Sequence, residues 1–300
     1  MIIPLLYSLS RFRLPVQVPV CVHTCTGRRQ TVGNDKTGYN LGEGIAMILV
    51  IDVGNTHTVI GVYEEEKLLG HWRISTNLEK TEDEYGMLVK SLLDNSELSL
   101  ADIKGVVISC VIPPVTWILK KMSIDYFKVS PIIVGPGTKT EIYIKTDNPK
   151  EVGADRIVNA IAAYKLYGGP VIIVDFGTAT TFCAVNTEGV YLGGAIAPGI
   201  EISAEALAEK TAKLPKIEII KPKNSIGSNT ISAMQSGIFF GYLGLTNELI
   251  RRFKKELGED SVVVATGGQA EFIGNESKLI DKINPYLTLQ GLRMVYEINK

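Results

Sequence analysis

The sequence predicts an α/β protein made of two related halves that face each other across a cleft. The chain has 300 residues, about twice the length of a typical domain, so two domains of similar size are expected. A strand–turn–strand unit occurs twice, 123 residues apart. Strands and amphipathic helices follow both copies in the approximate order βββαβα. A duplicated α/β fold accounts for all three observations.

The repeat becomes visible when residues 48–62 are aligned with residues 171–185. Four pairs of identical residues then coincide: Asp52 with Asp175, Gly54 with Gly177, Thr58 with Thr181 and Val62 with Val185. In each copy an apolar strand enters a tight Asp-x-Gly turn, and a second strand rich in Val and Thr follows. We expect a third strand after each copy, at Leu68–Ser75 and at Val190–Ala195.

The remaining pattern predicts helices between buried strands. Residues 80–95 begin with a Thr81-x-x-Glu84 capping box and continue with apolar residues at helical spacing, which indicates an amphipathic helix. The other expected elements are strands at 104–111 and 131–134 with a helix at 114–127 between them, a long helix at 231–257 and a strand at 261–265. Taken together, these elements predict two α/β domains of the ribonuclease H type, at 47–166 and 167–300.

The long helix carries Gly237, Gly241 and Gly244 on closely related faces. Small residues at this spacing allow another element to approach the helix closely. We therefore expect a crowded crossing in the core here, rather than a ligand site.

The amino-acid composition argues against several classes of protein. The chain has 31 Lys and Arg against 32 Asp and Glu, which argues against a protein whose main task is to neutralise nucleic-acid phosphate. No apolar run reaches the roughly 18 residues of a membrane-spanning helix, so no membrane partner is expected. The four cysteines are too few and too scattered for a disulfide scaffold, and we expect a reducing, cytoplasmic environment.

Residues 1–46 differ from the rest, with a net charge of +3 against −4 for the remainder. They show no sustained strand or helix period, whereas Met47 opens an apolar strand at once. A secretory signal would place its basic residues before the apolar stretch, and Cys21-x-His23-x-Cys25 has no second ligand pair for a metal. We expect an upstream start before the true Met47, and a disordered or poorly packed segment that is dispensable.

The repeated turn is suited to binding phosphate. Dinucleotide and Walker-type motifs run from a strand into a helix, whereas here a strand follows, and no Walker-type lysine is present. Gly54 lets the backbone approach a ligand, and Asn55, Thr56 and Thr58 supply small donors for phosphate oxygens. Asp52 at the strand end can hold Mg²⁺ directly or through water. An ordinary Asp-Gly hairpin is the alternative, which the presence of two matched copies disfavours.

A second candidate site lies in the stretch 148–157, where a loop leads into a predicted helix. Asp155 lies at or near the start of that helix, directly before Arg156. Asp155 can stabilise the helix as a cap or first-turn carboxylate, or it can act as a general base beside an arginine that binds an anionic substrate. Position alone does not decide between these roles.

The ordered set of motifs resembles the type III pantothenate kinase family, a member of the actin/hexokinase/Hsp70 superfamily of actin-like ATPases. The motifs are Asp52-Val-Gly-Asn-Thr56, Gly153-Ala-Asp-Arg156, Asp175-Phe-Gly-Thr-Ala-Thr180, Pro198-Gly199 and the loop from Ser225 to Thr230. The resemblance runs from Met47 to about Asn299. Asp-x-Gly-Asn-Thr alone is a weak signal, but the ordered set is specific.

The resemblance implies ATP-dependent phosphorylation of the primary alcohol of pantothenate, which is the first step of coenzyme A synthesis. It assigns ATP binding to Asp52, Val53, Gly54, Asn55, Thr56, His57, Thr58, Val59 and Thr178, with Asp52 helping to place Mg²⁺. It assigns pantothenate binding to Thr146, Gly153, Ala154, Asp155, Arg156 and Thr230, with Asp155 as the base. Asp175 matches the ligand of a monovalent cation, K⁺ or ammonium, which would take over part of the electrostatic work of the missing lysine. The family is homodimeric, with pantothenate near the subunit interface.

One residue departs from the family pattern, and two alternatives remain open. Relatives usually have a tyrosine where this chain has Thr146, which puts that contact with pantothenate in doubt. Another small-molecule kinase of the superfamily, for a sugar or acetate, would keep the hairpins but change the loop at 153–156. A non-catalytic transcriptional accessory protein would tolerate loss of the base, and the retention of Asp155 argues against it.

Overall fold

The computed structural model of the protein describes residues 46–300, which belong to one compact unit. The predictions for residues 1–45, including disorder and a start at Met47, lie outside the described residues. Within the described part, no helix combines the length and the apolar character needed to cross a bilayer.

The first sheet has five strands in the order β3-β2-β1-β4-β5. Their bounds are β1 Met47–Val53, β2 His57–Glu64, β3 Lys67–Ser75, β4 Ile103–Cys110 and β5 Ile132–Ile133. The strands β1, β2 and β3 form an antiparallel meander, whereas β4 pairs with β1 in parallel. The helices α1 (Glu82–Asp94) and α2 (Pro113–Met122) bury their apolar residues against one face of this sheet.

The second sheet repeats this arrangement. Its strands are β7 Val171–Phe176, β8 Ala179–Val185, β9 Val190–Pro198, β10 Val262–Thr266, β11 Lys282–Ile283 and β6 Tyr143–Ile144. Their order β11-β10-β7-β8-β9-β6 contains the order of the first sheet read in reverse, with β6 added at the edge beside β9. The duplicated ribonuclease H-like fold predicted from the repeat is confirmed.

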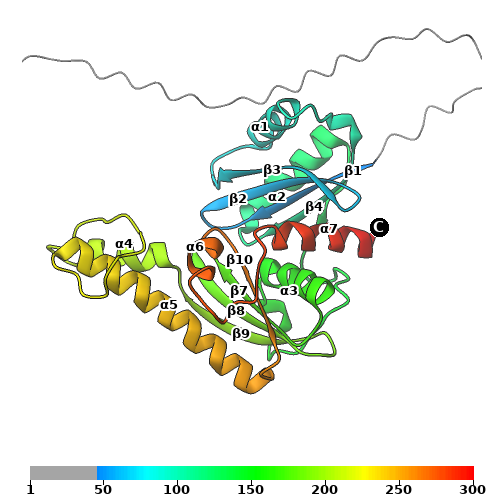
Figure 1. Cartoon of the computed structure of the whole chain (residues 1–300). Coiled ribbons are helices and arrows are strands. Elements are labelled where there is room, and N and C mark those ends of the chain that lie inside the picture. Colours follow the sequence, from blue (N-terminus) through cyan, green and yellow to red (C-terminus); the bar gives the residue numbers. More distant parts are fainter. Residues whose placement is uncertain (1–45) are drawn as a thin grey trace, which may run out of the picture. The chain divides into compact units, whose positions relative to one another are not determined.

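Two helices lie between the sheets, as Figure 1 shows. The helix α3 (Ala154–Tyr167) packs against α7 (Leu287–Asn299), and α7 also contacts β1 and β4 although it follows the second sheet in sequence. Their buried side chains join a core that includes Val50 of the first sheet and Ile173 of the second. The start of α3, which carries Asp155, is therefore fixed by packing on both sides.

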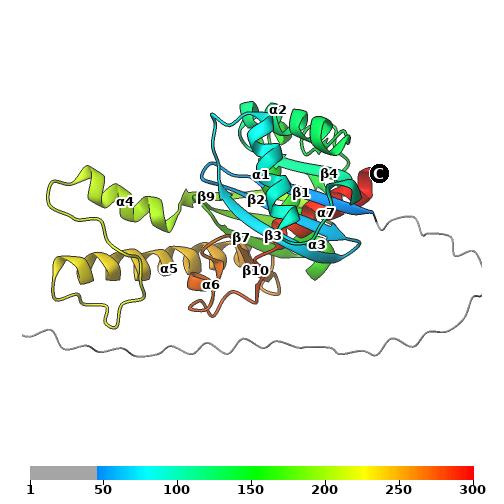
Figure 2. The ribbon, with the colours of Figure 1, turned by 90° about the horizontal axis from the view of Figure 1, so that it is seen from above.

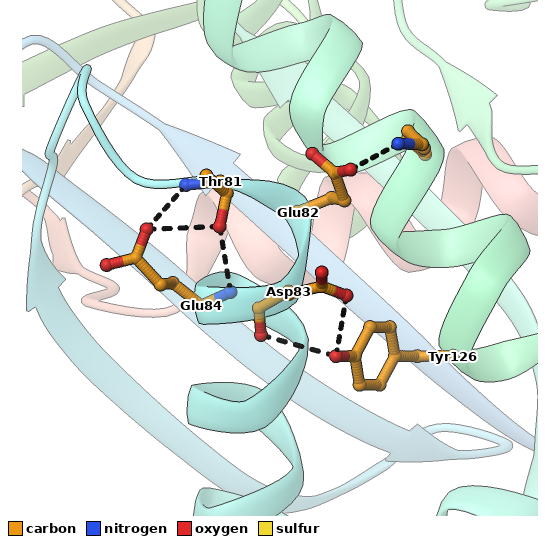
Figure 3. Close-up of polar contacts among 6 residues, drawn as sticks. Thr81, Glu82, Asp83, Glu84 and Tyr126 are labelled. Atoms are coloured by element: carbon orange, nitrogen blue, oxygen red, sulfur yellow. Dashed lines mark hydrogen bonds and ion pairs between the residues drawn. The ribbon is translucent and has the colours of Figure 1, made fainter.

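The predicted start of α1 is confirmed. The backbone N–H of Thr81 donates to Glu84 Oε2 at 2.8 Å, and the N–H of Glu84 donates to Thr81 Oγ1 at 3.3 Å, which is the reciprocal capping box (Figure 3). The hydroxyl of Tyr126 donates to Asp83 Oδ1 at 3.0 Å and thereby ties α1 to the segment after α2. These contacts orient α1 on the first sheet.

The helix predicted at 114–127 is shorter than expected. The α-helical part ends at Met122, and a π-helical turn follows over Ser123–Phe127. Lys128 then adopts a left-handed conformation (φ 58°), which ends the turn, and Ser123 Oγ donates to the carbonyl of Val129 at 2.7 Å.

The glycine face of the long helix does not cross another element of this chain. The helix α5 (Thr230–Leu257) runs beside α4 (Ile200–Lys210), and both project from the second sheet as an arm (Figures 1 and 2). Among the described residues, no atom lies within 4 Å of a Cβ built on Gly237, Gly241 or Gly244. The predicted core crossing is therefore wrong, because this face of α5 is open.

Candidate active site

The two repeated turns meet. The hydroxyls of Thr56 in the first turn and Thr178 in the second lie 3.0 Å apart and share a hydrogen bond. Each turn is closed by a glycine N–H, which donates to the carbonyl of His57 in the first and of Ala179 in the second. The structure thus brings together residues predicted to contact ATP from both halves of the chain.

Thr58 and His57 have partners within the protein. Thr58 is buried and its hydroxyl hydrogen-bonds Thr76, whose own hydroxyl donates to the carbonyl of Gly54 at 2.8 Å. Thr58 therefore braces the turn instead of presenting a free proton to a ligand. Arg73 donates to His57 Nδ1 at 2.8 Å, and burial together with the charge of Arg73 lowers the pKa of His57, which favours the neutral ring.

The side chains of Val53 and Val59 pack into the two cores, so these residues can offer only backbone groups to ATP.

Asp52 and Asp175 occupy equivalent positions at the carboxyl ends of β1 and β7. The next parallel strand places Ser109 beside Asp52 and Thr266 beside Asp175. Both neighbours are buried hydroxyl residues, and Ser109 Oγ makes no hydrogen bond with the described residues. Neither was singled out from sequence, although Ser109 lies near the end of the predicted strand 104–111 and Thr266 directly follows the predicted strand 261–265, which is the signal that could have found them.

The electrostatics show that three carboxylates gather here. Burial, followed by the charges of Asp155 and Asp175, raises the pKa of Asp52 to about 7. Burial, followed by the charge of Asp155, raises the pKa of Asp175 to about 7 as well. Both side chains keep some accessible surface, yet the surrounding protein excludes enough water to disfavour their charged forms. A cation at this place would relieve the repulsion between the carboxylates.

The donor set fits hard cations. Oxygen ligands suit Mg²⁺ and K⁺, and Ser109 adds a buried hydroxyl next to Asp52, where it lowers the pKa of that carboxyl and offsets part of the effect of burial. Within residues 46–300, no three acidic, His or Cys side chains are close enough to enclose one ion. This agrees with the usual binding of Mg²⁺ by one or two carboxylates together with water and substrate phosphates.

Asp175 is oriented by a residue that the sequence analysis did not single out. Asn159 Nδ2 donates to Asp175 Oδ2 at 2.9 Å, and Thr288 of α7 donates to Asn159 Oδ1 at 2.7 Å. The other oxygen, Oδ1, faces Gly267, where an added Cβ would overlap it and where φ is +91°. Asn159 lies one helical turn after Asp155, and that i, i+4 spacing within an otherwise apolar stretch is the signal that could have found it.

Asp155 is the second residue of α3 and not its N-cap. Gly153 occupies the cap position without a side-chain hydrogen bond, and Asp155 Oδ1 accepts from the backbone N–H of Arg156 at 2.8 Å. The carboxylate therefore satisfies one free amide of the first turn with one oxygen. Its second oxygen has no hydrogen-bond partner among the described residues and remains available for a substrate hydroxyl.

Arg156 and Thr146 converge on two consecutive glycines of β9. A Cβ on Gly194 would lie 3.1 Å from Arg156 Nη2, and one on Gly193 would lie 3.9 Å from Thr146 Cγ2. Thr146 Oγ1 is buried and makes no hydrogen bond with residues 46–300. Within that range, Arg156 forms no ion pair with an acidic side chain. A guanidinium without an acidic partner can receive a small anionic ligand.

Thr230 is not brought to this site within the chain. It is exposed, it begins α5 at the outer end of the arm (Figures 1 and 2), and it lines a separate hollow of about 550 Å³ with residues of α4 and α5 such as Leu207 and Met234.

The duplicated sheets, the meeting turns and the carboxylates between them define a protein of the actin-like ATPase class. Comparison with solved structures agrees on the fold. A Baf family protein of Campylobacter jejuni, titled a transcriptional activator, has a TM-score of 0.53 at 18% identity, covering 84% of this chain and 98% of the other. The ethanolamine utilization protein EutJ of Carboxydothermus hydrogenoformans has a TM-score of 0.50 at 16% identity, covering 83% and 89%.

Sequence comparison identifies the family within this class. The family model described as type III pantothenate kinase matches residues 48–252. A type III pantothenate kinase of Bacillus cytotoxicus is 56% identical over 253 residues, which are 84% of this chain and 97% of that relative. The chain belongs to the type III pantothenate kinase family.

Proposed function

We propose that this enzyme transfers the γ-phosphoryl group of ATP to the primary alcohol of pantothenate, giving 4′-phosphopantothenate in the first step of coenzyme A biosynthesis. The observation that carries the proposal is the placement of Asp155 at the start of α3, near the two aspartates of the duplicated turns, with Arg156 as the next residue. A proton acceptor, an anion-binding group and a phosphate-binding region thereby adjoin one another.

The ATP side of the reaction is assigned to the two turns. The hydroxyls of Thr56 and Thr178 hydrogen-bond to each other, and the same groups can donate to phosphate oxygens. Asp52 would hold Mg²⁺, and Asp175 would hold a monovalent cation. When bound, these cations neutralise charge on the phosphates, which is the main requirement of phosphoryl transfer.

The pantothenate side is assigned to the start of α3 and the loop before it. Arg156 pairs with the carboxylate of pantothenate and so fixes the position of its hydroxyl. The free oxygen of Asp155 accepts the hydroxyl proton as the alcohol attacks the phosphorus. Gly153 leaves room for the carboxylate of Asp155, because a Cβ at this position would lie only 2.5 Å from Asp155 Oδ1.

A turnover assay tests the proposal directly. The purified chain, given Mg²⁺-ATP and pantothenate in a K⁺ buffer, is expected to form ADP and 4′-phosphopantothenate in equal amounts. Acetate and hexoses serve as competing acceptors. Phosphorylation of one of these, with pantothenate left unchanged, would contradict the proposed substrate.

Replacing Thr146 is expected to change pantothenate binding alone. Thr146→Tyr should lower the KM for pantothenate by about threefold to tenfold, because one aromatic contact contributes roughly 1 kcal/mol. Thr146→Val should raise that KM without loss of stability, because the hydroxyl it removes has no protein partner. Steady-state kinetics and melting temperatures check both variants. A raised KM in Thr146→Tyr would mean that another residue already fills this space.

The open arm supports a homodimer in which Thr230 completes the site of the partner subunit. Besides the glycine face of α5, the arm exposes Ile202, Ile226 and Ile231, and the neighbouring strand β9 exposes Ile196. Exposed apolar side chains gathered in this way are typical of a protein interface. In such a dimer, each subunit would place its Thr230 near the active site of its partner. Thr230 does not reach the active site of its own chain.

Mixing two inactive variants is expected to restore activity if Thr230 acts across the interface. Thr230→Glu places a negative charge against the substrate carboxylate, and Asp155→Asn removes the base, so each homodimer should be nearly inactive. Mixed dimers keep one intact site, which predicts about a quarter of the wild-type activity after subunit exchange. Activity assays and sedimentation check this result. A monomer in sedimentation, or no recovery from confirmed mixed dimers, would contradict the arrangement.

We place the enzyme in the cytoplasm. The cysteines of the described part of the chain, Cys110 and Cys183, are both free thiols, which fits a reducing compartment. ATP and the enzymes that use it in metabolism are found there as well.

A further inference from the structure

Two residues of the second sheet hold the side chain of Arg156. Arg156 Nε donates to Cys183 Sγ on β8 at 3.4 Å, and the guanidinium carbon lies 5.8 Å from the centre of the Tyr191 ring on β9. The hydroxyl of Tyr191 donates to the same sulfur at 3.5 Å. Cys183 and Tyr191, called the Arg156 clamp below, are both almost fully buried.

The clamp orients Arg156 without neutralising it. Burial raises the pKa of the Cys183 thiol and of the Tyr191 hydroxyl, so both groups are uncharged at neutral pH. The guanidinium has five N–H donors, and the clamp uses the one on Nε. The four donors on Nη1 and Nη2 form the end of the planar group, and this end can pair with both oxygens of a carboxylate.

The neighbouring strand leaves room for that end of the guanidinium. Nη2 lies beside Gly194, where a side chain would crowd it and would also overlap the carbonyl of Phe182. The preceding residue, Gly193, lies beside Thr146, whose Cγ2 would be 3.9 Å from a Cβ at that position.

We propose that Cys183 and Tyr191 are positioning residues that hold Arg156 with its two terminal amino groups toward the carboxylate of the substrate. This inference rests on the proposed function, because it takes pantothenate as the substrate and Arg156 as the partner of its carboxylate. The clamp acts on one end of the acceptor and touches neither ATP nor the attacking hydroxyl. Its loss should therefore raise the KM for pantothenate and leave the KM for ATP unchanged.

The experiment compares pantothenate with its primary carboxamide, which keeps the reacting alcohol and lacks the negative charge. Cys183→Ala is expected to raise the KM for pantothenate about threefold to tenfold, the effect of one lost hydrogen bond, and Tyr191→Phe to raise it less. Cys183→Ser, which keeps an acceptor, should restore most of the loss. None of these changes should alter the KM for the carboxamide. Tyr164→Phe is the matched control, since it removes a hydroxyl near the C-terminal end of α3, where it donates to the carbonyl of Thr187.

Arg156→Met, measured beside these variants, separates the two levels of the proposal. If Arg156→Met raises the KM for pantothenate and not that for the carboxamide, Arg156 binds the carboxylate. An unchanged KM for pantothenate in Cys183→Ala and Tyr191→Phe would then overturn the clamp alone, and so would equal changes for both substrates. If Arg156→Met changes neither KM, the role assigned to Arg156 fails and the clamp loses its function with it. Melting temperatures identify variants that do not fold, and Tyr191→Phe still decides the question if Cys183→Ala does not fold.

Discussion

Asp155→Asn is expected to lower kcat by about 10²- to 10⁴-fold, the usual contribution of a general base, while ATP binding survives. The variant keeps the size of the side chain and the oxygen that accepts from the backbone N–H of Arg156. It removes only the ability to take a proton. The measurement is kcat with saturating ATP and pantothenate, combined with ATP binding by titration calorimetry.

The structure also predicts how stability responds to this substitution. Asp155 raises the pKa of both Asp52 and Asp175 through charge repulsion, so a neutral side chain here relieves strain between like charges. The melting temperature should stay the same or rise, which separates loss of chemistry from loss of folding. Glu151→Gln, in the same loop and exposed, is the matched control and should leave kcat unchanged. A near-normal kcat in folded Asp155→Asn would mean that Asp155 only stabilises the helix. Substrate positioning and the charge of the bound cations would then have to account for the catalysis of phosphoryl transfer.

The fold was predictable because its signals are local and occur twice. An apolar strand that ends in Asp-x-Gly and continues into a second strand specifies the hairpin β1–β2, and the same signal 123 residues later specifies β7–β8. Matched hairpins imply matched sheets, and the capping box likewise placed the start of α1. The open glycine face of α5 was misjudged because small residues at helical spacing look the same whether the approaching element lies in the same chain or in another one.

Site residues could be predicted where they lie within short sequence motifs, and could not be predicted where their role depends on contacts between distant residues. Short motifs along the chain contain Asp52, Asp155 and Asp175. Asn159 acquires its role only because Thr288, 129 residues later, orients its amide toward Asp175. Cys183 reaches Arg156 in the same way, through the packing of α3 on the second sheet. Such contacts arise from tertiary packing, which single-sequence periodicity does not contain.

Replacing K⁺ with Na⁺ and replacing Asp175 by asparagine are expected to lower activity by a similar amount, about 10²-fold, comparable to the loss of one preorganised electrostatic contact in other enzymes. Asp175→Asn keeps an oxygen for the hydrogen bond from Asn159 Nδ2 and removes the charge that would attract a monovalent cation. The chain has no Walker-type lysine, so we expect the cation to carry part of the charge on the transferred phosphates. The substitution also lowers the repulsion on Asp52, so the variant should fold at least as well as the wild type.

Two readouts keep this prediction separate from a general loss of activity. With a non-hydrolysable ATP analogue present, K⁺ should raise the melting temperature of the wild type more than Na⁺ does, because a cation that binds only the folded state stabilises it. This difference should vanish in Asp175→Asn. In turnover assays, the variant should have the same low rate in both salts, since it has lost the group that distinguishes them. Equal wild-type rates in K⁺ and Na⁺, or a salt dependence that persists in Asp175→Asn, would contradict the role of Asp175 as a ligand of the monovalent cation. Asp175 would then be assigned, together with Asp52, to the binding of Mg²⁺.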